Sequence, residues 1–374
     1  MHLYLHIPFC RKACHYCDFH FSTNLSQKEL LVKAMVTELT LQKDYLPDKR
    51  LSTVYLGGGT PSLLSEGELD ELMNAISAHF SISESAEITL EANPDDLTPE
   101  ALSNLRRAGI NRLSIGIQTF DDEMLHYLNR THTGGEAMDA VKRSQDSGIS
   151  NISLDLIYAL PAPGHERLKS DLDKIVMLGT SHLSAYCLTI EPDTAFGRWV
   201  QGRKMLPVDE EFAAAQFEFT IGELSAAGYE QYEISNFARD GHYSRHNTAY
   251  WQRKPYLGIG PGAHSYNGQS RQFNVSNNNK YLKDLTLGSL PASVEILTPD
   301  DQVNEYLLTG LRTKWGCSLG MLDQLSDGAF REIHRSTVKE LVARGWLQII
   351  DNTLLLTQSG KLFADRIASD LFIG

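Results

Sequence analysis

The chain has 374 residues, 42% of them apolar, and a formal net charge of −13. Its length suits one large domain plus a smaller one, and its composition is typical of a globular protein. The negative charge argues against unspecific nucleic-acid binding, which depends on clustered Lys and Arg side chains. The N-terminus lacks the pattern of a signal peptide and no apolar run has the length of a membrane span, so we expect a cytoplasmic protein.

The first distinctive feature follows a strand-like segment, residues 2–7, and holds three of the five cysteines: Cys10, Cys14 and Cys17. Three thiolates on one short loop can bind an iron–sulfur cluster or supply most of a tetrahedral zinc site. A closed zinc site needs a fourth ligand, for which His15 or His20 is the best candidate. Three thiolates on a four-iron cluster leave one iron open to a substrate or cofactor. The spacing favours this open cluster over zinc.

Five further strand-like segments follow at spacings typical of parallel strands joined by helices: residues 51–56, 87–90, 112–117, 151–156 and 182–188. Capping boxes at Ser26 and Ser65, and Thr98 before Pro99, predict the starts of helices between them. Six such units are too few to close an eight-stranded barrel. We therefore predict an α/β fold with an open, partial (β/α)6 barrel.

Glycine-rich or polar sequence begins where these strands end, at residues 57–60, Glu91, Gln118, Asp155 and Glu191. Cofactors and substrates bind at the carboxyl edge of parallel sheets, so we expect one shared site there. For Asp155 or Glu191 alone, a second interpretation is that the carboxylate only satisfies backbone groups of its own loop. The isolated Cys187 and Cys317 are expected to be small buried apolar side chains.

The second half departs from the alternating pattern. Residues 209–227 predict a long helix ended by Gly228, and residues 229–234 are strand-like. Residues 267–299 are the most linker-like stretch, with a helix expected over residues 281–287.

The last part of the chain predicts a winged-helix-like module. Its helices are expected at residues 302–311, 319–325 and 330–343, and a hairpin turns at Asp351-Asn352. No basic stripe accompanies them, so we favour a role other than DNA binding. The expected division is a partial barrel over residues 1–206, a connecting or lid region over 207–299, and a C-terminal α+β domain over 300–374.

The cysteine loop, followed by Asp18 and Phe19, resembles the signature of radical S-adenosylmethionine enzymes. In that superfamily three cysteines hold a [4Fe–4S] cluster, and the methionine amino and carboxylate groups of S-adenosylmethionine chelate the fourth iron. The resemblance implies that role for the three cysteines of the loop. It also implies the S-adenosylmethionine contacts Tyr4, Gly58, Gly59, Thr60, Glu91, Gln118, Arg130 and Asp155. Carboxylates suit ribose hydroxyls and an amino group, and Arg130 suits a carboxylate.

Two further motifs narrow the resemblance. Residues 245–251, RHNTAYW, resemble a signature of the HemW-type haem chaperone branch, and residues 258–264, GIGPGAH, match the same branch. The resemblance makes His246 the first candidate for a haem ligand and His264 a weaker one. Taken by itself, a histidine beside aromatic residues is more often a packed side chain.

The resemblance implies a haem chaperone that carries a [4Fe–4S] cluster, binds S-adenosylmethionine and delivers haem to acceptors such as respiratory enzymes, with no catalytic residue assigned. It is compatible with a homodimer and with a peripheral position at the membrane during delivery. The segment HIPFC, residues 6–10, also resembles the oxygen-independent coproporphyrinogen oxidase branch. Oxidative decarboxylation of coproporphyrinogen III is therefore the first alternative function. That branch has a further cysteine where this chain has Phe19. A zinc-stabilised winged-helix regulator is the second alternative.

Overall fold

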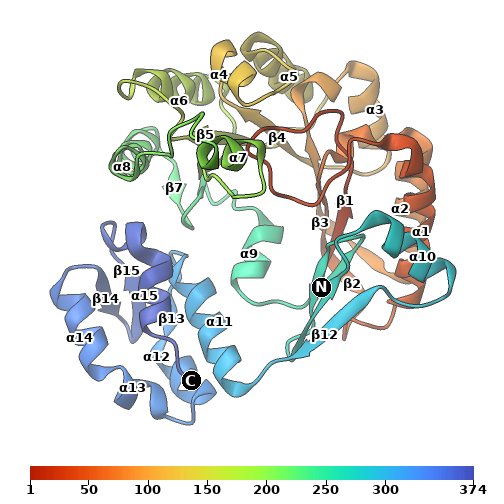
Figure 1. The fold of residues 1–374 in the computed structure, drawn as a ribbon. Coiled ribbons are helices and arrows are strands. Elements are labelled where there is room, and N and C mark those ends of the chain that lie inside the picture. The colour runs from red at the N-terminus through yellow and green to blue at the C-terminus, as the bar shows by residue number, and fades with distance from the viewer.

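The computed structural model describes all residues from 1 to 374, and its first six strands lie side by side in chain order. They form one parallel sheet: β1 (His2–Ile7), β2 (Arg50–Gly58), β3 (Ser81–Ala92), β4 (Arg112–Gln118), β5 (Asn151–Tyr158) and β6 (His182–Cys187). Figure 1 shows the connecting helices around the outside of this curved sheet. The two edge strands of the complete sheet do not pair with each other, so the predicted open, partial barrel is confirmed.

The connecting helices are α1 (Lys28–Leu41), α2 (Glu66–His79), α3 (Pro99–Arg107), α4 (Asp122–Tyr127), α5 (Gly134–Asp146) and α6 (Glu166–Leu178). Helix α7 (Ala195–Gln201) follows β6 and lies against the cysteine loop, where the Phe196 amide donates to the His15 carbonyl. Two predicted starts are confirmed: the Ser65 capping box at α2, and Thr98 before Pro99 at α3. The capping box predicted at Ser26 is wrong. Asn24 instead caps a short 3-10 turn, Leu25–Gln27, and α1 begins after it without a side-chain cap, because the turn has already redirected the chain.

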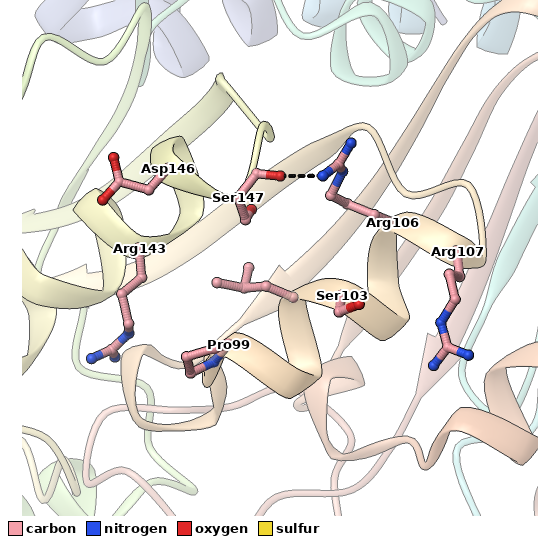
Figure 2. A pocket seen from close by; sticks show the side chains of 8 residues that line it. Pro99, Ser103, Arg106, Arg107, Arg143, Asp146 and Ser147 are labelled. Atoms are coloured by element: carbon pink, nitrogen blue, oxygen red, sulfur yellow. Dashed lines mark hydrogen bonds between the residues drawn. The ribbon is translucent and has the colours of Figure 1, made fainter.

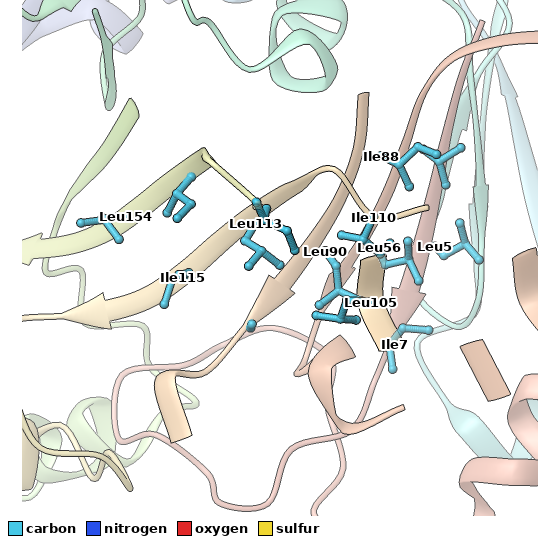
Figure 3. Packing of buried hydrophobic residues seen from close by; sticks show 14 of the residues in the cluster. Leu5, Ile7, Leu56, Ile88, Leu90, Leu105, Ile110, Leu113, Ile115 and Leu154 are labelled. Atoms are coloured by element: carbon cyan, nitrogen blue, oxygen red, sulfur yellow. The ribbon is translucent and has the colours of Figure 1, made fainter. Parts of the chain in front are cut away.

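The strand register fixes which side chains face the helices. Leu5, Leu56, Leu90 and Leu113 lie opposite one another across β1 to β4, and all four are fully buried. Figure 3 shows them packed with their neighbours in a core of 54 buried residues. Burial of each such side chain stabilises the fold by roughly 1.5–3 kcal/mol. Because strand side chains alternate between faces, the residues next to these leucines face the barrel interior.

The region expected to be a linker continues the sheet instead. After α8 (Glu210–Ala226) come β7 (Glu230–Gln231), β8 (Asn236–Ala238), α9 (Arg245–Trp251), β9 (Tyr256–Ile259), β10 (His264–Tyr266), β11 (Ser270–Asn274), α10 (Asn278–Thr286) and β12 (Ala292–Ile296). Strand β9 pairs parallel to β1, and β10 to β12 follow it in antiparallel order.

The prediction of a linker over residues 267–299 is therefore wrong. Its helix was foreseen, and α10 places Tyr281 and Leu285 in the main core. The strands on either side of α10 pair with each other, and the buried residues of β11 are the polar Ser270, Gln272 and Asn274. Their burial leaves no apolar alternation in the sequence.

The C-terminal part has its own core of 16 buried residues, from Val303 to Ile373. Its elements are α11 (Pro299–Leu311), β13 (Cys317–Ser318), α12 (Leu319–Leu325), α13 (Ala329–Ile333), α14 (Arg335–Ala343), β14 (Leu347–Ile350), β15 (Thr353–Leu356) and α15 (Ala364–Asp370). The helix expected over residues 330–343 is broken at His334 into α13 and α14. The three-part division of the chain stays a prediction. None of the helices is long and apolar enough to cross a membrane.

Candidate functional site

A cavity of about 580 Å³ lies where the parallel strands end, beside the cysteine loop. Glu91, Ser114 and Asp155 each directly follow a core residue on β3, β4 and β5, so strand alternation turns them into the barrel. The cavity brings together most of the residues expected from the sequence: Cys10, Cys14, Cys17, Thr60, Glu91, Gln118, Arg130, Asp155 and Glu191. Tyr4, Gly58, Gly59 and His246 are not part of its lining.

The cysteine loop is fixed to the barrel by hydrogen bonds at several points. The Cys10 amide donates to the Ser22 carbonyl at 3.1 Å. Thr60 Oγ1 lies 3.4 Å from Cys10 Sγ, and Arg130 Nη1 lies 3.5 Å from Cys14 Sγ. These contacts hold the half-buried thiols at the edge of the cavity. Burial raises the pKa of the Cys17 thiol to about 12, so metal binding must release its proton.

The side chains around the loop do not form a zinc site. No three His, Cys, Asp or Glu side chains converge on a single metal position. A tetrahedral zinc ion needs every thiolate about 2.3 Å from one centre, whereas a cluster spreads its thiolates over separate irons. The two histidines considered as a fourth zinc ligand are engaged elsewhere. His15 Nδ1 lies 2.9 Å from the Tyr127 carbonyl, and His20 Nε2 lies 2.8 Å from Asn278 Oδ1.

Glu91 is the central carboxylate of the cavity floor. It accepts hydrogen bonds from the Tyr55 hydroxyl at 2.8 Å and from the Gly58 amide at 3.0 Å. Burial raises its pKa to about 7, and these two hydrogen bonds oppose that rise. Asp155 accepts a hydrogen bond from Ser114 Oγ at 3.2 Å, and burial raises its pKa to about 6. Both groups can therefore change protonation near neutral pH.

The glycine run at the end of β2, residues 57–59, has a steric function that the sequence did not reveal. Gly58 has a φ of +105°, and a Cβ there would lie 2.5 Å from the His6 ring. A Cβ on Gly59 would lie 2.7 Å from the Ile7 carbonyl oxygen. Only glycine lets the end of β2 approach β1 and the cysteine loop so closely. The glycine run thereby positions the next residue, Thr60, in the cavity lining.

Arg130 crosses from the α4–α5 connection to the cavity. Its Nη2 donates to Asn93 Oδ1 at 2.6 Å and to the Gly116 carbonyl at 2.7 Å, while its Nε is buried without a partner. A buried guanidinium with a spare donor is suited to an anionic group in the cavity. Gln118, at the end of β4, has a φ of +64°, a conformation that costs energy for a side chain other than glycine.

His246 lies in a different layer, at the amino-terminal end of the barrel interior. Helix α9 carries it into the barrel, where its amide donates to Glu87 Oε1 at 3.1 Å. Its Nδ1 lies 2.6 Å from Thr53 Oγ1, and its Nε2 lies 2.7 Å from the Tyr250 hydroxyl. The side chain is 1% exposed, and burial lowers its pKa well below the ordinary value. Both ring nitrogens are thus engaged in this structure, and His246 does not line the cavity beside the cysteine loop.

Tyr4 and His264 also differ from expectation. The Tyr4 hydroxyl lies 3.0 Å from His6 Nδ1, in the layer between His246 and the cavity. His264, on β10, is exposed, and its ring lies 5.8 Å from that of Phe273, tilted by 38°, rather than joining His246. The two candidate haem ligands therefore do not form one site.

Several lining residues were missed from the sequence: Tyr16, Asn93, Tyr186 and Cys187. The expectation that Cys187 is a buried apolar side chain is wrong, because the residue is half-buried in the cavity wall. Its position at the carboxyl end of β6 was the available signal. Cys317 is fully buried, as expected.

A separate cavity of about 670 Å³ lies outside the barrel, where α3 meets α5 (Figure 2). Three arginines line it, but each already has a partner within the chain. Arg106 Nη1 donates to the Ser147 carbonyl, Arg107 pairs with Glu66 at 2.8 Å, and Arg143 donates to a backbone carbonyl. These contacts give all three arginines a structural role between neighbouring elements.

Comparisons with known proteins agree with this geometry. The radical SAM superfamily matches residues 4–175, and the HemN C-terminal domain matches residues 297–363. The heme chaperone HemW of Bacillus subtilis is 36% identical over 97% of both chains. The protein of that name from Escherichia coli is 32% identical over 99% of this chain and 97% of its own.

Among solved structures, coproporphyrinogen III oxidase (HemN) from Escherichia coli has the same fold. Its TM-score is 0.85 at 23% identity, and the match covers 99% of this chain and 89% of that one. At this identity the likeness concerns the fold alone. The similarity to the HemW proteins extends over nearly the full length of both partners. The chain therefore belongs to the HemW family of the radical S-adenosylmethionine superfamily.

Proposed function

We propose that this protein is a haem chaperone that binds haem and passes it to haem-accepting proteins, respiratory enzymes among them. The observation that carries the proposal is the full-length similarity to proteins named heme chaperone HemW. It works in the cytoplasm, with peripheral contact at the membrane during delivery, and a homodimer is part of the proposal. These finer points follow from the family resemblance.

In this proposal Cys10, Cys14 and Cys17 hold a [4Fe–4S] cluster. Their position together at the edge of one cavity supports that assignment. A cluster with one iron free of protein ligands supplies an open coordination position and one-electron chemistry. The three thiols are half-buried at the edge of the cavity.

The remaining cavity residues are proposed to bind S-adenosylmethionine. Arg130, with its spare buried donor, takes the carboxylate, and Glu91 takes the amino group. Asp155, Gln118 and Thr60 contribute polar groups to the same lining. Tyr4, Gly58 and Gly59 are proposed to act from behind the lining, by fixing the strand ends.

The haem ligand expected from the sequence, His246, carries a structural condition. Coordination of iron by its ring requires the hydrogen bond to Thr53 or to Tyr250 to break, and α9 to expose the ring. His264 needs no such opening because it is exposed.

A second candidate function is oxidative decarboxylation of coproporphyrinogen III. The observation that favours it is the fold shared with coproporphyrinogen III oxidase. The residue that counts against it is Phe19, which replaces a further cysteine of that branch and is 66% exposed at the cavity.

A paired assay on anaerobically reconstituted protein distinguishes the two functions. Haem is titrated by absorbance, and coproporphyrinogen III, S-adenosylmethionine and a reductant are supplied to the same preparation. We expect stoichiometric haem binding and no protoporphyrinogen. Turnover to protoporphyrinogen without specific haem uptake would overturn the chaperone and establish the oxidase.

A further inference from the structure

A third cavity, of about 400 Å³, lies between the barrel and the C-terminal part of the chain, and we call it the interdomain cavity. Helix α8 forms one wall through Phe217, and the segment before α15 forms the opposite wall through Leu362 and Phe363. Tyr158 and Cys187, at the ends of β5 and β6, form its floor. Nine of its 14 lining residues are hydrophobic. Phe363 is 40% exposed, so an apolar surface is left for a ligand to cover.

The rim of this interdomain cavity is cationic although the chain as a whole carries −13. Three cationic side chains line it against two carboxylates. Lys361 donates to Gln231 Oε1 at 2.8 Å and forms no ion pair, because Glu230, the carboxylate that acts on its charge, pairs with Lys314 instead. Arg366 is largely exposed, and its only ionic partner is Asp370 at 3.8 Å. Both side chains are therefore available to an anionic ligand.

Cys187 connects the interdomain cavity to the cavity beside the cysteine loop, because it lines both. Its thiol is half-buried and lies beside the Tyr158 hydroxyl. Thiolates are established axial ligands of haem iron. An apolar slot, two free cations at its rim and a soft donor at its floor match the three parts of a haem: the flat macrocycle, the propionates and the iron.

We propose that haem binds in the interdomain cavity, with its macrocycle between α8 and the segment before α15, its propionates at Lys361 and Arg366, and Cys187 as the iron ligand. This inference rests on the proposed haem-binding function and names the site for it. It competes with the assignment of His246, which lies on the far side of the barrel interior and is sealed. A fatty acid would meet the same apolar walls and cations, but it would not sense Cys187.

The test is a haem titration of the cluster-loaded protein, read as a difference spectrum against the same protein without haem. The variants are Cys187→Ala, Cys187→His and Lys361→Gln, and Lys339→Gln is the matched control because Lys339 is exposed on α14 away from the cavity. We expect a thiolate-type spectrum in the wild type, its loss in Cys187→Ala, and an imidazole-type spectrum in Cys187→His.

We expect Lys361→Gln to weaken haem binding roughly tenfold, as removal of one charge-assisted hydrogen bond would, while Lys339→Gln binds like the wild type. Wild-type affinity and spectrum in both Cys187→Ala and Lys361→Gln would overturn this site but leave the chaperone function in place. Absence of haem binding by the wild type would instead overturn the function itself. Far-ultraviolet circular dichroism of each variant confirms that the fold compared is the same.

Discussion

The two ends of the barrel interior carry the two most distinctive motifs of the chain, and they differ in what their side chains can reach. At the carboxyl end the cysteine loop borders a cavity, and Arg130 keeps a donor free. At the amino end α9 places His246 among Thr53 and Tyr250, with no free ring nitrogen and 1% exposure. The cysteine loop is available for binding, whereas His246 is engaged in a hydrogen bond that joins α9 to β2.

This difference shows that a motif can identify a family without identifying a ligand. The cysteine loop resembles the signature of the whole superfamily and residues 245–251 resemble that of one branch, yet only the cysteine loop lies at an open site in this structure. A buried histidine with two side-chain hydrogen bonds is costly to replace, which is reason enough for its presence. The predictions below test whether the two ends really divide into binding and stability.

The largest effect is expected at the open end. Replacing Cys14 by alanine should abolish the [4Fe–4S] cluster, because two thiolates cannot hold it in place of three. Iron and acid-labile sulfide, measured after anaerobic reconstitution, should fall to background. Cys317→Ala is the control, since Cys317 is buried in the C-terminal core and should leave iron content unchanged. A full iron complement in Cys14→Ala would remove this cysteine from the ligand set.

The next largest effect is expected at the amino end of the barrel interior, where His246 is buried. His246→Ala should lower the free energy of unfolding by about 3 kcal/mol, because it leaves a cavity and deprives Thr53 and Tyr250 of their partner. His264→Ala, at an exposed position, should change it by less than about 0.5 kcal/mol. Urea unfolding measures both. A stable His246→Ala protein that has lost haem binding would show that α9 opens and that the histidine is a ligand.

A moderate effect is expected for the free donor of Arg130. Arg130→Met should weaken S-adenosylmethionine binding by about 10- to 100-fold, the range expected for loss of one or two charge-assisted hydrogen bonds. Equilibrium dialysis with the cluster-loaded protein measures the affinity. Arg107→Met is the control, because Arg107 lies on the outer face and pairs with Glu66. Equal affinities in the two variants would place the carboxylate elsewhere.

The smallest effect on stability is expected for a buried carboxyl group outside the barrel interior, that of Glu38. Glu38 accepts hydrogen bonds from the Gly260 amide at 2.8 Å and from Asn274 Nδ2 at 2.6 Å, and so anchors the loop before β10. Burial raises its pKa to about 7 from an ordinary value of 4.5. The folded state therefore binds this proton more tightly than the unfolded state does, and the stability it adds below pH 4.5 is lost as pH rises to about 7.

Glu38→Gln should remove this loss of stability with rising pH. The free energy of unfolding of the variant, relative to that of the wild type, should therefore increase from pH 4.5 to pH 7. Urea unfolding at several pH values measures it. Parallel stability curves for the two proteins would mean that Glu38 does not titrate in this range. Glu91 has a similarly raised pKa but lines the cavity, so its titration should instead appear in S-adenosylmethionine binding.

Much of the fold was predictable from local signals. Alternating apolar residues and the caps at Ser65 and Thr98 located the strands and two helix starts correctly. The strands from residue 256 to 296 were not predictable, because they are short and stabilised by pairing with β1 and with one another. Pairing partners far apart in the sequence leave no local pattern.

The candidate site divides in the same way. The sequence by itself determined the family, the grouping of Cys10, Cys14 and Cys17, and the row of polar residues at strand ends, because spacing and strand period are local properties. Only the tertiary structure decided that His246 is sealed, that Gly58 and Gly59 serve close packing, and that Cys187 joins two cavities. Exposure and free hydrogen-bonding capacity depend on which distant segments cover a side chain, and no local pattern encodes that.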